Sequence, residues 1–123
     1  MSARLVIADD SSTILAMVVL AVGRDGYEPA TANDGLEALA AIREHRPELV
    51  IIDAMMPGLT GYEVCAAIRD DPDAPKPYVL MLTAGGREID RKRADEVGVD
   101  EFATKPFSPS WLRSRVKEVL GEP

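Results

Sequence analysis

The sequence predicts one α/β domain built on a doubly wound, five-stranded parallel sheet with five helices. Short runs of branched apolar residues, uninterrupted by polar side chains, are typical of strands buried on both faces. The five expected strands alternate along the chain with stretches of helical pattern, which is the order of an α/β fold. Because both faces of such strands must be covered, we expect a three-layer sandwich with helices on each side of the sheet.

The length and composition are those of a single globular domain. The 123 residues suffice for one hydrophobic core and are too few for two, so residues 1–123 are expected to form one domain. A net charge of -7 argues against nucleic acid or an anionic membrane as the main partner, because both attract basic proteins. The single cysteine, Cys65, cannot form an internal disulfide and fits a reducing compartment.

No signal peptide pattern opens the sequence, and its longest apolar run, Ile14 to Val22, is too short to cross a bilayer. We therefore expect a cytoplasmic protein.

Most of the expected strands are short and strongly apolar. The clearest is Leu49–Asp53, in which four branched apolar residues precede an aspartate, and Pro57 and Gly58 then turn the chain. The second strand is mixed in polarity, which places it nearer an edge of the sheet. The five expected strands are Leu5–Ala8, Tyr27–Ala32, Leu49–Asp53, Tyr78–Thr83 and Glu101–Thr104.

Capping residues delimit the expected helices. Ser11, Ser12 and Thr13 offer N-cap side chains for a first helix through Arg24, and Asp34 precedes a second helix that Pro47 stops. Ser108, followed by a proline at the first helical position, begins the last helix. The third and fourth helices are expected at about residues 61–69 and 87–97.

Apolar positions predict the buried face of each helix. In the second helix the residues expected to face the sheet are Leu36, Ala38, Leu39 and Ile42. The fourth helix is highly charged, so we expect it to be the most weakly packed. Its only apolar anchors are Ile89, Ala94 and Val97.

The first helix is apolar all round. When one face packs on the sheet, Leu15 and Val19 are left on the far side, one turn apart. They are either part of a surface for a protein partner or scattered surface apolar residues of no special function.

Polar side chains stand at the ends of four strands. Asp9 and Asp10 follow the first strand, Asp53 ends the third, Thr83 ends the fourth and Lys105 follows the fifth. In a parallel sheet these ends share one edge, where ligands bind in open α/β folds. Singly, each residue could be a helix cap, a turn former or a solvated lysine. Those explanations leave open why all four ends fit one site.

This set of side chains suits phosphoryl transfer to a carboxylate. Three neighbouring carboxylates repel one another unless a cation neutralises them, and ligands that are all oxygen suit a hard cation such as Mg²⁺. Lys105 adds a second positive charge and Thr83 a hydroxyl donor. Metal and lysine would neutralise the phosphoryl oxygens while a carboxylate attacks in line.

The same segments resemble the receiver domains of two-component response regulators along essentially the whole chain. The matching segments are Val6-Ile7-Ala8-Asp9-Asp10, Val50-Ile51-Ile52-Asp53-Ala54-Met55-Met56-Pro57-Gly58, Leu82-Thr83-Ala84 and Lys105-Pro106-Phe107-Ser108-Pro109. The resemblance implies a flavodoxin-like fold with strand order 2-1-3-4-5. It also implies a phosphorylation-dependent switch in a phosphorelay, not an enzyme that acts on other molecules.

The resemblance implies partners and a role for each site residue. A histidine kinase or histidine phosphotransferase would supply the phosphoryl group, and a downstream protein or a second copy could receive the signal, without direct contact with nucleic acid or membrane. Asp53 corresponds to the phosphoacceptor, and Thr83 and Lys105 to the pair that contacts the phosphoryl group. The groups implied to organise Mg²⁺ are Asp9, Asp10, Asp53 and the backbone carbonyl of Met55. A cis Lys105–Pro106 bond is implied as well.

Phe102 lies where the family carries an aromatic switch residue, often a tyrosine. Phenylalanine has no hydroxyl to offer a partner. We expect phosphorylation of Asp53 to draw Thr83 toward the new oxygens and to vacate space for the ring of Phe102. Gly85 and Gly86 would lower the cost of moving the joint that they form before the fourth helix.

Two other functions fit parts of the sequence. A phosphatase with an aspartate nucleophile carries a second acid two residues later, where this chain has Met55, and it carries a cap domain. A flavodoxin-like FMN carrier could use Ser11, Ser12 and Thr13 as a phosphate loop, but the preceding aspartates would repel the phosphate. Whether the domain stands alone or belongs to a longer regulator is left open by the sequence.

Overall fold

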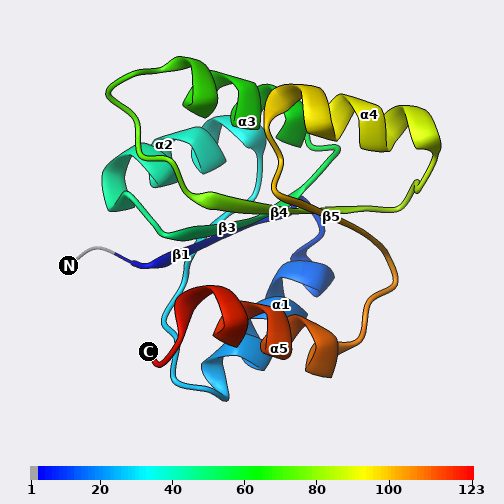
Figure 1. The fold of residues 1–123 in the computed structure, drawn as a ribbon. Helices are drawn as coiled ribbons and strands as arrows, with labels where there is room; N and C mark the ends of the chain where they lie inside the picture. Colours follow the sequence, from blue (N-terminus) through cyan, green and yellow to red (C-terminus); the bar gives the residue numbers. More distant parts are fainter. Residues whose placement is uncertain (1–2) are drawn as a thin grey trace.

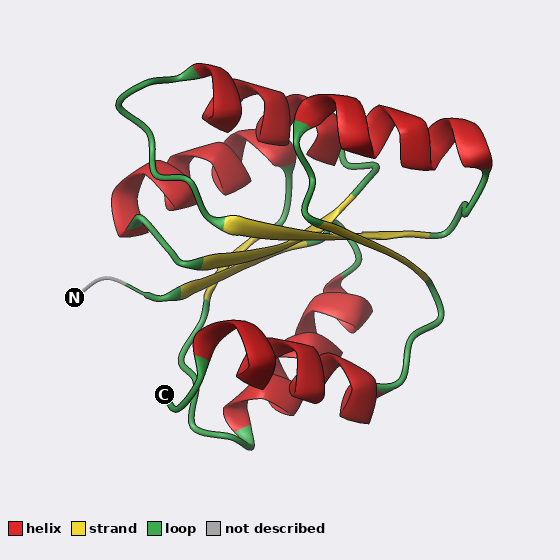
Figure 2. Ribbon diagram, in the orientation of Figure 1, coloured by secondary structure: helices red, strands yellow, loops and turns green. Residues whose placement is uncertain are grey.

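A computed structural model describes residues 3–123, which form alternating strands and helices around one sheet (Figures 1 and 2). The strands are β1 (Leu5–Ala8), β2 (Ala30–Ala32), β3 (Leu49–Asp53), β4 (Tyr78–Thr83) and β5 (Glu101–Thr104). The helices are α1 (Ser12–Gly23), α2 (Gly35–His45), α3 (Gly61–Asp70), α4 (Glu88–Val97) and α5 (Pro109–Leu120). Among these helices, none has the length and apolar character needed to span a membrane.

The sheet confirms the predicted fold class and strand order. Its five strands are parallel and lie in the order β2-β1-β3-β4-β5. Figure 1 shows α2, α3 and α4 on one face and α1 and α5 on the other, so the molecule has three layers. The register pairs Ala8 with Ile52, and Thr83 with Thr104. The polar residues that follow these positions therefore finish at one edge of the sheet.

The two central strands supply both halves of the core, because every residue of β1 and β3 is buried. Alternate side chains point to opposite faces. Val6 and Ile52 pack in the cluster beneath α2, α3 and α4, whereas Ile7 and Ile51 pack in the cluster beneath α1 and α5. Burying one such side chain stabilises the fold by roughly 1.5–3 kcal/mol, which explains why a continuous apolar run identifies these strands.

Four strands have the predicted bounds, and the second is shorter than expected. Strand β2 begins at Ala30 instead of Tyr27. The Tyr27 amide donates to the Val22 carbonyl (3.3 Å), and its hydroxyl donates to the Gly121 carbonyl. Tyr27 therefore links the ends of α1 and α5. Its amide is bonded to Val22 and does not pair with β1.

The structure selects Ser11 among the three candidate N-caps of the first helix and confirms the predicted N-caps of the second and the last. The side chains of Ser11, Asp34 and Ser108 accept hydrogen bonds from the amides three residues later, at 3.3, 2.8 and 3.2 Å. Helix α1 ends at Gly23 instead of Arg24, and α4 begins one residue later than expected, at Glu88. Such shifts of one residue are usual at helix ends.

The prediction that Leu36 faces the sheet is wrong, since 63% of this residue is exposed. Ala38 and Ile42 are buried as predicted. The reason lies at Gly35, where an added Cβ would stand 2.0 Å from the Leu59 carbonyl oxygen. The glycine presses the start of α2 against the loop before α3, so the next side chain along the helix points away from the core.

Helix α4 buries only Ala94, where each other helix buries three or more residues. Ile89, predicted as an anchor, is 66% exposed, and this prediction is wrong because the first turn of α4 extends beyond the sheet (Figure 1). Its C-terminal end is held more firmly. The Cys65 thiol donates to the Val97 carbonyl (3.3 Å), and Arg69 Nε donates to the Gly98 carbonyl (3.1 Å).

Leu15 and Val19 do not form an exposed surface. Both are half-buried against the cluster beneath α1 and α5, because α5 packs against α1. The large apolar residue of α1 that is exposed is instead Leu20, at 71%.

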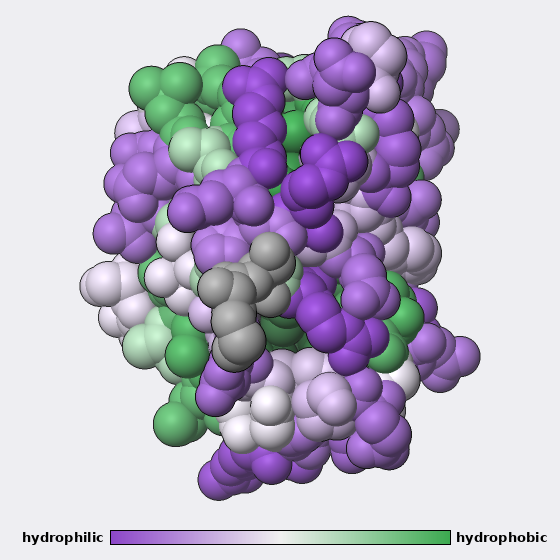
Figure 3. Space-filling view, turned by 90° about the vertical axis from the view of Figure 1, so that its left-hand side faces the viewer, coloured by the Kyte–Doolittle hydropathy of each residue, from purple (hydrophilic) through white to green (hydrophobic). Residues whose placement is uncertain are grey.

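The face of the molecule at the opposite edge of the sheet from the polar strand ends is largely hydrophilic (Figure 3).

Candidate functional site

Three carboxylates meet at the carboxyl edge of β1 and β3. Asp9 is 3% exposed and Asp53 8%, while Asp10 is exposed. One carboxylate oxygen from each of the three lies within 4.8 Å of the others. The Ser11 amide donates to Asp9 Oδ1 (2.9 Å), which fixes the first acid at the start of α1. The adjacency of β1 and β3 in the sheet brings together acids that are 43–44 positions apart in the sequence.

Lys105 bridges two of these acids. Its Nζ lies 2.9 Å from Asp9 Oδ2 and 3.4 Å from Asp53 Oδ1. The Lys105 amide donates to the Thr83 carbonyl (2.7 Å), so the end of β5 is tied to the end of β4. The Lys105–Pro106 bond is cis, as the resemblance implied. The structure therefore brings the predicted lysine to the predicted acids.

Thr83 is buried and lines the same cleft as Asp53 and Lys105. Its Oγ1 accepts a hydrogen bond from the Gly85 amide (3.2 Å). Because the oxygen accepts this bond, the hydroxyl proton can be donated to a ligand.

A glycine sets the close approach of α3 to the end of β3. A Cβ on Gly61 would stand 2.3 Å from the Asp53 carbonyl oxygen, so only glycine fits there. Thr60 caps α3 reciprocally with Glu63, at 3.1 and 2.9 Å. Met55, two residues after Asp53, is 60% exposed at the rim of the cleft.

Burial and neighbouring charges shift the pKa values of Asp53 and Lys105. Burial raises the pKa of Asp53 to about 6, repulsion from Asp9 adds to this, and the positive charge of Lys105 opposes it. Burial alone would lower the pKa of Lys105, but its bonds to Asp9 and the charge of Asp53 outweigh burial and raise it. One lysine thus leaves negative charge uncompensated. An all-oxygen site of this kind fits a hard divalent cation.

A cleft with a volume of about 530 Å³ opens beside Asp53. Helix α4 contributes Asp90 and Arg93 to its wall, Arg87 joins them from the N-cap position before α4, and α3 contributes Tyr62. This wall was not expected from the sequence. Arg87 follows Thr83 by only four residues and could have been noticed, but the place of Arg93 depends on packing against α3.

Phe102, the expected switch residue, is half-buried on β5 against the cluster beneath α2, α3 and α4. The guanidinium carbon of Arg91 lies 5.1 Å from the centre of its ring. This distance is within the range of a cation–π contact, so α4 contacts the ring through a charged side chain.

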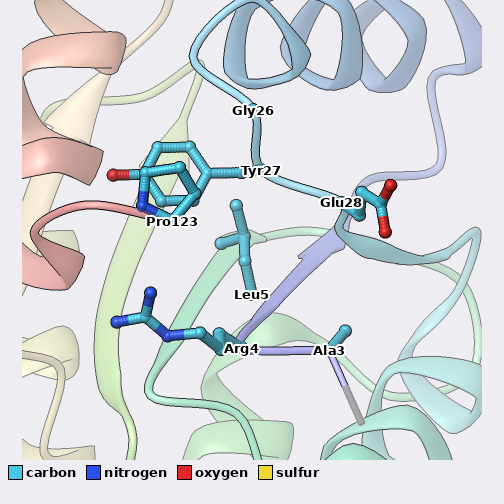
Figure 4. Close-up of a pocket in the computed structure, with 7 residues that line it drawn as sticks. All are labelled: Ala3, Arg4, Leu5, Gly26, Tyr27, Glu28 and Pro123. Carbon is cyan, nitrogen blue, oxygen red and sulfur yellow. The ribbon is translucent and has the colours of Figure 1, made fainter. Parts of the chain in front are cut away.

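A second hollow, of about 180 Å³, lies at the opposite edge of the sheet (Figure 4). Figure 4 shows the ring of Pro123 beside that of Tyr27, with Arg4 below them. Arg4 donates to the carbonyls of Leu120 (2.6 Å) and Glu122 (2.9 Å), so it closes the C-terminal end of α5. The residues around this hollow therefore anchor the end of α5, and none of the three carboxylates of the site lines it.

Comparison with known proteins agrees with this geometry. Residues 5–117 match the family model of the response regulator receiver domain. The chain belongs to this family. It is 42% identical over 117 residues to the probable transcriptional regulator ycf27 of Guillardia theta, which covers 95% of this chain and 45% of that protein. It is 37% identical over 120 residues to the DNA-binding response regulator MtrA of Mycobacterium tuberculosis, which covers 98% of this chain and 51% of MtrA.

The receiver domain thus spans about half the length of the curated relatives it matches. Among solved structures, the chemotaxis protein CheY4 of Vibrio cholerae superposes with a TM-score of 0.87 and 34% identity, covering 98% of this chain and all of CheY4. The BeF3-activated DrrB receiver domain superposes with a TM-score of 0.84 and 31% identity, covering 98% of both chains. The protein is therefore a receiver domain of the two-component response regulators, as the resemblance implied.

Proposed function

We propose that this receiver domain accepts one phosphoryl group on Asp53, and that residues 1–123 act as one switch domain. The observation that carries the proposal is the position of Lys105, whose ammonium lies 3.4 Å from Asp53 within a cluster of three carboxylates. A structural ion pair alone would need one acid, whereas a site that receives a phosphoryl group needs a nucleophile together with groups that neutralise the incoming charge.

Four groups of this chain would hold Mg²⁺: the carboxylates of Asp9, Asp10 and Asp53 and the backbone carbonyl of Met55. When bound, this ion supplies positive charge that neutralises oxygens of the transferred phosphoryl group. The fit rests on the donor set itself, which is entirely oxygen and carries more negative charge than Lys105 compensates.

The chain's own residues divide the work of transfer. An Asp53 carboxylate oxygen attacks the phosphorus atom, and the bond between phosphorus and the donor atom breaks, with its electron pair leaving on the donor. Lys105 shifts from Asp9 toward the phosphoryl oxygens, and Thr83 donates its hydroxyl proton to another of them. Attack by water on the aspartyl phosphate reverses the modification. The domain thus catalyses only its own phosphorylation and dephosphorylation.

The phosphodonor is a phosphohistidine of a histidine kinase or a histidine phosphotransferase, with a small acyl phosphate as a substitute. A net charge of -7 disfavours direct contact with nucleic acid or an anionic membrane, so the signal passes to a protein or to a second copy. The buried free thiol of Cys65 fits a cytoplasmic location.

Intact-mass analysis after incubation with acetyl phosphate and Mg²⁺ tests the proposal. One phosphoryl adduct is expected on the wild-type domain, and none on Asp53→Asn or in the presence of a chelator. An adduct that persists on the variant, or that forms equally well without Mg²⁺, contradicts the assignment.

A further inference from the structure

We propose that Arg87 and Arg93 form an anion subsite beside the phosphoacceptor, which favours phosphodonors whose leaving group is an anion. The inference rests on the proposed function, because it concerns how a donor is bound before its phosphoryl group reaches Asp53. Its basis is the cleft of about 530 Å³, a volume in the range of small-molecule sites.

The cleft joins the site to the first two turns of α4. Asp53, Thr83 and Lys105 line one part of it, and all three are buried or half-buried. Arg87 and Arg93 line another part and are exposed. A small donor with its phosphorus atom at Asp53 would thus extend its leaving group toward the exposed part of the cleft, where the arginines lie.

Each arginine is held near the cleft by a neighbour. The Arg93 guanidinium carbon lies 4.3 Å from the centre of the Tyr62 ring, and this tyrosine is only 3% exposed. The ring is therefore a fixed platform for the cation. Arg87 Nε lies 3.1 Å from Asp90 Oδ2.

This part of the cleft carries two guanidinium groups and one carboxylate, a net positive charge in a chain whose total charge is -7. The positive charge is therefore local to the cleft. In the donor position described above, the leaving group develops its negative charge in this part of the cleft. Fixed charges affect a reaction rate most where charge develops.

The chemistry of the leaving group decides whether this charge matters. With acetyl phosphate, a bond forms between an Asp53 oxygen and phosphorus, the bond from phosphorus to the acyl oxygen breaks, and acetate leaves with the electron pair. With phosphoramidate, whose nitrogen carries its protons in the ground state, the P–N bond breaks and neutral ammonia leaves. The arginines stabilise a departing carboxylate and give no such help to ammonia.

The effect is electrostatic and partly screened. Charges that line a cleft change rates by about tenfold or more at low ionic strength, so we expect about three- to tenfold for one exposed arginine. Screening shortens the range of exposed charges to about 3 Å at 1 M salt, so the preference should decline as salt is added.

The test measures the rate of adduct formation from acetyl phosphate and from phosphoramidate, by intact mass with Mg²⁺, and compares the ratio of the two rates. The variants are Arg87→Gln and Arg93→Gln, each of which should lower the ratio. The matched control is Arg24→Gln, an exposed arginine at the end of α1 with the same change in charge. Circular dichroism establishes that each variant is folded.

A ratio that falls three- to tenfold in both cleft variants, and that declines less with added salt than the wild-type ratio does, supports the subsite. The inference is overturned when both cleft variants keep the wild-type ratio, or when Arg24→Gln lowers it as much. In either case a wild-type domain that reacts with both donors leaves the proposed function standing. A wild-type domain that reacts with neither contradicts the proposed function, and the subsite with it.

Discussion

Lys105 Nζ donates to Asp9 Oδ2 across 2.9 Å, although the two residues are 96 positions apart in the sequence. The contact joins the end of β5 to the end of β1 across β3 and β4, so it holds the segments after these two strands at the same edge of the sheet. Asp9 is nearly buried and carries a charge whose main protein partner is this lysine. Removing the lysine therefore leaves buried negative charge without compensation.

The first prediction follows from this relationship. Lys105→Ala should lower the free energy of unfolding by about 2–4 kcal/mol in chelator at pH 7, since a buried ion pair has lost one partner. Mg²⁺ should restore more stability to the variant than it adds to wild type, because it neutralises the same carboxylates. Urea unfolding with and without Mg²⁺ measures both effects. Equal stability of the variant and wild type in chelator would show that Asp9 is compensated by other groups.

The raised pKa of Asp53 gives a second prediction. Its value of about 6 in the fold lies above the ordinary 3.8. The protonated form is therefore favoured by folding, and the associated stability is present below pH 3.8 and lost as pH rises through 6. A shift of this size corresponds to up to about 3 kcal/mol. Asp53→Asn, measured in chelator, should thus be more stable than wild type at pH 7 and equal to it near pH 4.

The control for this pH dependence is Asp95→Asn, which neutralises an exposed aspartate of α4. Its stability relative to wild type should not follow the same profile. A difference between Asp53→Asn and wild type that stays constant from pH 7 to pH 4 would contradict the assignment of the raised pKa to Asp53.

A third prediction concerns an ion pair away from the site. Asp25 accepts hydrogen bonds from Arg113 Nε (3.0 Å) and Nη2 (2.8 Å), and the bond to Arg113 lowers the pKa of Asp25 to about 2. This pair ties the turn after α1 to α5. Because the folded pKa lies below the ordinary 3.8, the pair stabilises the fold above pH 3.8, and the contribution is lost as pH falls through 2.

Arg113→Gln should therefore be less stable than wild type at pH 7, and the deficit should shrink as pH falls below about 4. Urea midpoints between neutral and acidic pH measure this. A deficit that is independent of pH would show that Arg113 acts through the packing of its side-chain stem and not through Asp25.

The strands and the convergence of the site could be predicted from the sequence for one physical reason. Strands buried on both faces leave an uninterrupted apolar run, and a parallel sheet puts all their carboxyl ends at one edge. Asp53 and Lys105 could thus be assigned to one site. Individual helix contacts were less predictable, because a residue such as Ile89 has a helical apolar spacing whether or not the sheet extends beneath it.

Side-chain positions that depend on another helix lay beyond sequence reasoning altogether. Arg93 lines the cleft because the ring of Tyr62, on α3, lies under its guanidinium group. Nothing in the local sequence of α4 distinguishes Arg93 from Arg91, yet Arg91 contacts Phe102 instead. The two side chains differ only in the neighbours that the packing of α4 gives them.

The last prediction concerns the switch, which we expect to couple Asp53 to Phe102 through α4. Three features favour a change there. Helix α4 buries only Ala94, it has no side-chain cap at its N-terminal end, and its C-terminal end is held by bonds to the carbonyls of Val97 and Gly98. Such a helix can move at its start while its end stays attached. Movement of Thr83 toward a phosphoryl group would pull on that start through the Gly85 amide, which donates to Thr83.

NMR spectra of the domain with and without beryllofluoride and Mg²⁺ measure this coupling. Shifts should extend from the site through residues 83–97 to the ring of Phe102, since the two states need differ by only a few kcal/mol for a ligand to change their populations. Phe102→Leu should bind beryllofluoride but lose the shifts near Arg91, whose guanidinium group no longer has a ring to contact. Shifts confined to the site in the wild-type domain would mean that Phe102 is a fixed core residue. The phosphorylated surface around Asp53 would then carry the signal by its charge alone.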